Sequence, residues 1–170
     1  MTILIEEVDS TVKVQSVRFG EMNVSEQNVF TFSQGLPGFE SNKQFVVLQA
    51  PDDLPFYFMQ SIDDAELAFV ITDPFLFYKE YTFDLPEAVQ QELDVQRSDQ
   101  VQVWSIVSID TTGGLECACT NLMAPIVVNK DNNQCRQIIL HNTTYGLKHP
   151  LIFQAESKPI GSPDAIEKGN

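Results

Sequence analysis

Three cysteines and two histidines are the side chains of this sequence best suited to hold a metal. Cys117 and Cys119 alternate within an apolar stretch, so a strand there would place both thiols on one face. A structural zinc site needs four ligands, usually with a wider cysteine spacing, and neither His141 nor His149 has a partner at ligand spacing. We therefore predict no metal site, and we interpret these cysteines, with Cys135, as buried thiols that pack as small apolar side chains.

The residues that could support catalysis lack the partners that catalysis requires. Ser61 and Ser105 lie in or near apolar strands, without the G-x-S-x-G elbow of a nucleophilic serine. Asp63 and Asp64 are adjacent and would point to opposite sides of an extended chain, so we interpret them as an acidic turn. Gly113–Gly114 indicates a turn and no phosphate-binding loop. No catalytic residue and no cofactor is predicted, and the chain is not expected to be an enzyme.

The elements that carry these residues are short strands rich in β-branched and aromatic side chains. The expected strands are a Val12–Phe19 stretch with an irregularity, 30–32, 45–48, 56–59, 67–71, 101–107, 115–123, 126–128 and 137–140. Their number and spacing predict an all-β fold, a small closed or partly open β-barrel-like single domain with one or two short helices.

Predicted turns and helix starts lie between these strands. Gly35–Gly38 contains two glycines and a proline, which predicts a tight turn that places Phe39 in the core. A capping-box-like start at Asp84 predicts a helix that runs to about Leu93, and Asp73 with the proline after it predicts a weaker helical turn.

The domain is expected to span residues 1–153. The polar, proline-containing segment 154–170 has little to bury, so we expect a disordered tail. The first residues lack the basic start and long apolar core of an export signal, and no stretch is long enough to span a membrane. With an odd number of cysteines, these features favour the cytoplasm.

Negative charge dominates the chain, which carries a net charge of −14. Twelve acids lie between residues 49 and 99, where only Lys79 and Arg97 oppose them. Such a field disfavours direct nucleic-acid binding, and it attracts basic partners. Solubility alone is the alternative explanation of this acidity.

Five motifs follow one another over residues 10–151: Gly35–Glu40 (GLPGFE), Pro55–Ser61 (PFYFMQS), Leu67–Pro74 (LAFVITDP), Asn121–Asn129 (NLMAPIVVN) and the stretch Gln137–Leu151. In this order and spacing they resemble the FliW family of flagellar assembly factors. Cys117–Cys119 and the chain beyond Phe153 are not part of the pattern. The resemblance implies a regulatory binding protein with a small β-barrel-like fold and no catalytic activity.

The resemblance also implies two alternating partners. FliW-like proteins bind flagellin, here expected through a terminal helix, and alternatively bind the translational repressor CsrA, a basic RNA-binding dimer. Binding to CsrA would relieve repression of flagellin mRNA. Two other classes remain open at this point: a small-barrel, flavin-type cofactor-binding enzyme and a structural component of the flagellum.

Acids and aromatic residues stand close together in one loop-rich stretch, as they do in protein interfaces. We expect the partner-binding surface there; its residues are Asp63, Asp64, Glu66, Asp73, Phe75, Phe77 and Tyr78. The alternative is that Phe75 and Phe77 are core residues under a loop.

Overall fold

The computed structural model describes residues 10–153 of the chain. The strands are β1 (Thr11–Ser16), β2 (Gly20–Ser25), β3 (Val29–Phe32), β4 (Gln44–Gln49), β5 (Tyr57–Ser61), β6 (Ala68–Thr72), β7 (Val101–Ser108), β8 (Cys119–Thr120), β9 (Ile126–Asn129), β10 (Gln134–Gln137) and β11 (His149–Pro150). The helices are α1 (Glu87–Glu92) and the single-turn 3-10 helices η1 (Glu26–Asn28), η2 (Pro74–Leu76), η3 (Ser98–Gln100) and η4 (Gly114–Cys117).

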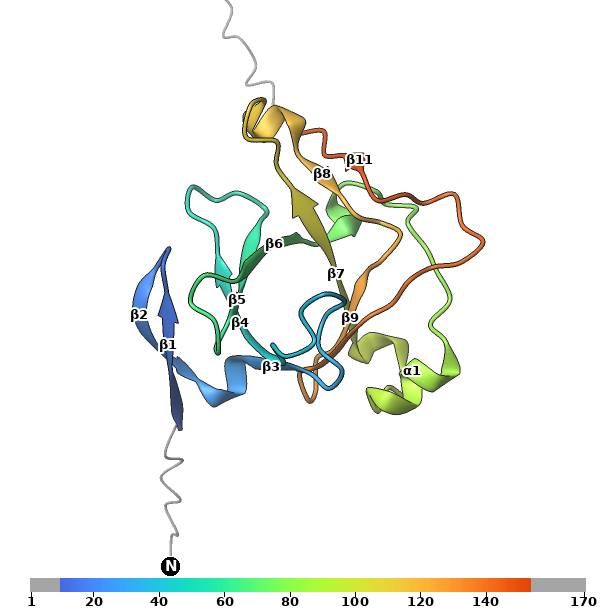
Figure 1. Ribbon diagram of the computed structural model, residues 1–170. Helices are drawn as coiled ribbons and strands as arrows, with labels where there is room; N and C mark the ends of the chain where they lie inside the picture. The colour runs from blue at the N-terminus through green and yellow to red at the C-terminus, as the bar shows by residue number, and fades with distance from the viewer. Residues whose placement is uncertain (1–9, 154–170) are drawn as a thin grey trace, which may run out of the picture.

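Seven of these strands close into a barrel (Figure 1). Antiparallel neighbours run in the order β3, β4, β5, β6, β7, β9 and β10, and a parallel pairing of β10 with β3 completes the ring. Strands β8 and β11 extend the sheet outward from β7. The predicted all-β, barrel-like fold with few helices is confirmed, and the barrel is closed.

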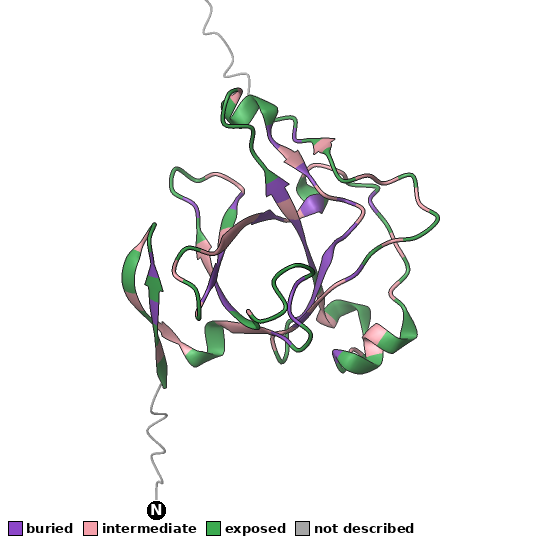
Figure 2. Ribbon diagram, in the orientation of Figure 1, coloured by how far each residue is buried: buried purple, intermediate pink, exposed green. Residues whose placement is uncertain are grey.

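Side chains alternate between the inside and the outside of the barrel. The inner core consists of Phe32, Leu36, Phe45, Met59, Ile71, Trp104, Ile126, Val128 and Cys135. Strand β7 is buried on both faces, because Trp104 points inward while Val103 packs outward against Tyr81 and Leu122. The segment between β6 and β7 therefore covers one side of the barrel, and Figure 2 shows the buried residues concentrated in the ring.

The stretch expected as one irregular strand over Val12–Phe19 is a hairpin. Strands β1 and β2 pair with Thr11 opposite Ser25, and the turn lies between Ser16 and Gly20. Val14 is fully buried, and Figure 1 shows the hairpin on the outside of the barrel, beside β4 and β5. The second strand was missed because its sequence, GEMNVS, lacks a continuous apolar face.

Two other predicted strands have different bounds. Residues 115–123 form mostly η4 and a turn, with a two-residue strand at Cys119–Thr120, because Gly114 adopts a φ of +61° and turns the chain. The strand expected at 137–140 ends at Gln137, after which Ile138 donates its N–H to the main-chain oxygen of Pro125.

The two predicted helical segments both exist, with one cap placed wrongly. Asp73 caps η2, since its carboxylate accepts the N–H of Phe75 at 2.9 Å. Asp84 does not cap α1, which begins at Glu87 with Pro86 in the N-cap position and without a side-chain cap. The proposed tail, 154–170, lies outside the described residues.

Candidate partner-binding surfaces

The seven residues predicted to bind a partner lie on two separate parts of the surface. Asp63, Asp64 and Glu66 lie in the turn between β5 and β6, and all three are exposed. The other four residues follow the opposite end of β6; they are Asp73, Phe75, Phe77 and Tyr78. Because the length of β6 separates the two groups, the structure does not bring all seven into one patch.

The first group belongs to residues 62–67, which we call the acidic turn. Gln60 is 1% exposed, and its amide nitrogen donates to main-chain oxygens of the turn, among them that of Asp64 at 3.0 Å. The hydroxyl of Ser61 accepts the N–H groups of Asp63 and Asp64, both at 3.2 Å. The exposed carboxylates therefore project from a backbone that buried hydrogen bonds hold in place.

The hairpin β1–β2 supports the acidic turn from the other side. The hydroxyl of Ser16 donates to the side-chain oxygen of Gln60 at 2.9 Å. The N–H of Val17 donates to the main-chain oxygen of Ala65 at 3.0 Å. Beside this junction the guanidinium of Arg18 lies 4.8 Å from the centre of the Phe58 ring, a cation–π contact.

The second group divides into anchoring and exposed side chains. Phe77 packs in an outer apolar cluster, and its ring contacts that of Phe153 with centroids 5.6 Å apart. Tyr78 donates its hydroxyl to the main-chain oxygen of Pro150 and packs edge-on against His149. Phe75 is 40% exposed and tilts over Tyr81, so it is the most accessible aromatic side chain of this group.

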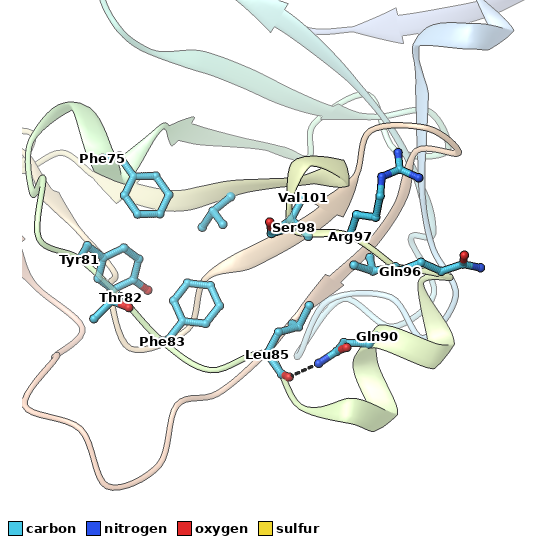
Figure 3. A pocket seen from close by; sticks show the side chains of 12 residues that line it. Phe75, Tyr81, Thr82, Phe83, Leu85, Gln90, Gln96, Arg97, Ser98 and Val101 are labelled. Atoms are coloured by element: carbon cyan, nitrogen blue, oxygen red, sulfur yellow. Dashed lines mark hydrogen bonds between the residues drawn. The ribbon is translucent and has the colours of Figure 1, made fainter.

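A groove of about 450 Å³ opens beside Phe75 and extends toward α1 (Figure 3). We call it the aromatic groove. Its apolar lining residues are Phe75, Tyr81, Phe83, Leu85, Val95, Val101 and Val103. Its polar lining residues are Thr82, Gln90, Gln96, Arg97 and Ser98.

Hydrogen bonds fix the walls of this groove. The hydroxyl of Tyr81 donates to the main-chain oxygen of Leu122 at 2.8 Å, and burial raises the pKa of Tyr81 well above its usual range, so it stays a donor. The amide of Gln90 on α1 donates to the main-chain oxygen of Leu85 at 2.7 Å, the dashed line in Figure 3. Residues 81–85 and α1 are thereby tied to each other and to the barrel.

A buried asparagine positions the far end of α1. The side-chain nitrogen of Asn129 donates to the main-chain oxygens of Leu93 and Asp94 at 2.8 and 3.1 Å. Its side-chain oxygen accepts the N–H of Asp131 at 3.0 Å. One amide at the end of β9 thus holds both the end of the helix and the β9–β10 turn.

Several acids are sequence neighbours of residues that line the aromatic groove. These acids are exposed; they are Glu80, Asp84, Asp94 and Asp99. Arg97 is a cation of the lining, and its Nε lies 3.0 Å from the carboxylate of Asp99. The lining of the groove itself is apolar with five polar residues, and Arg97 is its charged member.

The structure places Cys135, Cys117 and Ser105 in three different environments. Cys135 is buried, and burial raises the pKa of its thiol well above the usual range, which fits the predicted packing role. Cys117 is exposed, contrary to that prediction, because it lies in η4 and not in a strand. Ser105 accepts the hydroxyl of Thr120 at 2.6 Å inside the sheet.

Among residues 10–153 no three His, Cys, Asp or Glu side chains gather where they could hold a metal ion. No helix in that same range is long and apolar enough to cross a membrane.

Sequence reasoning missed most of the aromatic groove and the residues that hold both surfaces. Tyr81, Phe83 and Leu85 alternate with the exposed Thr82 and Asp84, a period of two that signals a chain with one buried side. This pattern could have identified the groove wall. No local signal marks Gln60 or Asn129 as buried, because their partners come from other elements.

The sequence of this barrel matches a known protein family. A model of the FliW protein family matches residues 13–151. The chain belongs to the FliW family. It is 40% identical over 138 residues to the flagellar assembly factor FliW of Bacillus pumilus (strain SAFR-032), which covers 81% of this chain and 94% of that protein. It is 39% identical over 132 residues to that of Bacillus subtilis (strain 168), covering 78% and 91%.

A solved FliW structure has the same fold. A crystal structure of the flagellar assembly factor FliW aligns with a TM-score of 0.73 at 34% identity, and the match covers 82% of this chain and 96% of that one. The resemblance expected from the five motifs is therefore confirmed.

The FliW motif GLPGFE forms a turn, and the segment between β3 and β4 that contains it lies over the barrel opening in Figure 1. Gly35 and Gly38 have φ values of +69° and +85°, as the predicted turn requires. Phe39 is 40% exposed and packs edge-on against Phe69, so its predicted place in the core was wrong. Leu36 fills the core instead, because the turn directs it into the barrel.

Proposed function

We propose that this FliW-family chain regulates flagellar assembly by binding, without catalysis, and that it acts in the cytoplasm. It binds flagellin, and in exchange it binds the basic repressor CsrA and thereby relieves repression of flagellin mRNA. The relatives' name supports the flagellar role, and the two partners follow from the resemblance described above. No site for nucleic acid or membrane is proposed.

The acidic turn is the observation that supports the proposed binding to CsrA. Asp63, Asp64 and Glu66 present three exposed carboxylates on a backbone held by Gln60 and Ser61. A preorganised negative surface speeds the encounter with a basic partner and loses little conformational entropy on binding. We assign Asp73 and Phe75, with the anchoring Phe77 and Tyr78, to a second contact area at the other end of β6.

The test is charge reversal on the turn. Asp63→Lys with Glu66→Lys is the sharpest pair, because the carboxylate of Asp64 accepts the N–H of Glu66 at 2.9 Å and shapes the turn. We expect association with purified CsrA to slow about tenfold at low salt and to become less sensitive to salt. Stopped-flow association at two salt concentrations measures both effects.

The matched control reverses two exposed acids elsewhere, Glu26→Lys with Glu116→Lys, which changes the net charge equally. If both double variants slow association to the same degree, the effect comes from total charge and the assignment to the turn is wrong. Flagellin added to the preformed complex with CsrA should release CsrA. A stable ternary complex would contradict exchange.

A further inference from the structure

Residues 145–153, which we call the C-terminal strap, lie beside the segment that follows η2 and run in the opposite direction. Three pairs of rings join the two segments; they are Tyr145 with Tyr81, His149 with Tyr78, and Phe153 with Phe77. The hydroxyl of Tyr145 also accepts the N–H of Thr82 at 3.2 Å. The strap therefore packs along the aromatic side chains that follow β6.

The beginning and the end of the strap are held in different ways. Strand β11 pairs with β8, and the N–H of Leu151 donates to the main-chain oxygen of Ala118 at 2.9 Å. Within residues 10–153, no such bond joins Ile152 or Phe153 to another main-chain group. Because Ile152 is exposed, packing of the Phe153 ring holds the end of the strap.

The ring of Phe153 lies against two other rings at once. Its centroid is 5.7 Å from that of Phe56 and 5.6 Å from that of Phe77, with interplanar angles of 84° and 85°. Both contacts are edge-to-face, an arrangement in which aromatic pairs stabilise beyond the burial of their area. Phe56 is buried in an apolar cluster with Leu151, whereas Phe153 is 37% exposed. Phe56 and Phe77 therefore form an aromatic seat that opens to the surface, and Phe153 fills it.

We infer that the aromatic seat is a binding site for an aromatic side chain of another molecule, and that Phe153 is an internal occupant that competes for it. An external ring can make the same two edge-to-face contacts. Its entry displaces residues 152–153, which take part in none of the main-chain hydrogen bonds found within residues 10–153. The internal occupant lowers the apparent affinity for an external ring in proportion to the fraction of time during which the seat is empty.

The seat and its occupant come from different parts of the chain. Phe56 and Phe77 lie within residues 13–151, which the FliW family model matches, and Phe153 lies beyond that range. The seat itself does not depend on the proposed function. The identity of the molecule that supplies the ring does rest on it, because Phe77 belongs to the second contact area proposed above.

The experiment uses the full chain and the probe N-acetyl-phenylalaninamide, which is neutral and so insensitive to the net charge of −14. The probe is titrated into protein with isotopically labelled phenylalanine, and NMR records the ring signals of Phe56 and Phe77. Phe153→Ala empties the seat, so we expect the probe to shift both signals at about tenfold lower concentration than in the wild-type chain. N-acetyl-leucinamide, which lacks a ring, should bind Phe153→Ala at least about threefold more weakly than the probe.

The matched control is Ile152→Ala, which truncates the neighbouring exposed side chain and leaves Phe153 in place. It should respond to the probe as the wild-type chain does. Thermal melting shows whether each variant is folded. If Phe153→Ala is poorly folded, Phe153→Leu replaces it, because leucine keeps an apolar contact but makes no edge-to-face pair. This variant should also bind the probe more tightly than the wild-type chain.

Equal binding of the probe to the wild-type chain and to Phe153→Ala overturns the competition, and unchanged signals of Phe56 and Phe77 in Phe153→Ala overturn the site. Binding of CsrA and flagellin to the same proteins separates this inference from the proposed function. If the probe enters the seat of Phe153→Ala but neither partner binds, the inference stands and the proposed function fails. If both partners bind and the probe does not, the proposed function stands and the inference fails. Partner binding that tightens in Phe153→Ala, together with entry of the probe, supports both.

Discussion

The hydroxyl of Ser16 donates to the side-chain oxygen of Gln60 over 2.9 Å, and both residues are buried although they belong to different sheets. The nitrogen of the same Gln60 amide serves the acidic turn. The Gln60 side chain therefore helps to hold the hairpin β1–β2 against the proposed partner surface, together with the bond from the Val17 N–H to the main-chain oxygen of Ala65.

Replacing Gln60 with leucine should lower the free energy of unfolding by about 3 kcal/mol. The change removes the acceptor of the buried Ser16 hydroxyl and the side-chain donor that the main-chain oxygens of Asp64, Ala65 and Leu67 share. Urea denaturation measures the loss. The control is Gln15→Leu, whose side chain makes an exposed hydrogen bond to Glu21 and should change stability by less than ~0.5 kcal/mol. Equal effects of the two variants would show that the buried network contributes little.

Two glycines with similar φ should respond differently to alanine. At Gly35, φ is +69° and a Cβ would lie 2.6 Å from Cα of Glu40, so Gly35→Ala should cost about 3 kcal/mol or more. At Gly20, φ is +75° but a Cβ would meet nothing within 4 Å, so Gly20→Ala should cost about 1 kcal/mol. Thermal or urea unfolding of both variants tests the difference. Similar losses would mean that backbone strain, and not the contact with Glu40, explains the glycine in the FliW motif.

Glu40 makes the same loop sensitive to acid. The N–H of Gly38 donates to its carboxylate at 3.0 Å, and this bond lowers the pKa of Glu40 below its ordinary value of 4.5. Because the folded-state pKa is the lower one, the stabilisation is fully present above pH 4.5 and is lost as the pH falls through the lowered pKa. An NMR titration should give the Glu40 carboxyl a midpoint below 4.5, with the Gly38 amide proton shifting at the same midpoint. A Gly38 amide that does not follow Glu40 would contradict this assignment.

Asn129→Asp should loosen α1 and reduce the free energy of unfolding by about 3 kcal/mol. The new carboxylate would face the main-chain oxygens of Leu93 and Asp94 where the amide now donates. Hydrogen exchange of the α1 amides should accelerate more than that of the barrel amides. The exposed Asn23→Asp serves as control and should have neither effect. Unchanged exchange in α1 would refute the positioning role of Asn129.

Local patterns predicted the features of this fold that depend on local chemistry. The alternation in Phe30–Phe32, the glycines at Gly35 and Gly38 and the cap at Asp73 all lie within a few residues of the groups they act on. Phe39 was misplaced because the GLPGFE turn contains two large apolar side chains, Leu36 and Phe39, and the sequence does not show which of them faces the barrel; Leu36 occupies the core.

Contacts between residues far apart in the sequence decide the arrangement of the candidate surfaces. The predicted acids and aromatics are neighbours in sequence, yet β6 separates Asp64 from Phe75 at its two ends. The groove wall at Val95 and Val101 meets Phe75 only because the segment after η2 folds back over β7. No pattern within a short window contains that information.

The parallel pairing of β3 with β10 also determines when the barrel can close during synthesis on the ribosome. Phe32 emerges about 100 residues before its partner Cys135, which corresponds to roughly 5 to 20 s of elongation. Until then β3 has an open edge, a template for pairing with other chains. A nascent chain can therefore present its acidic turn early, but it cannot close the barrel until most of its length has been translated.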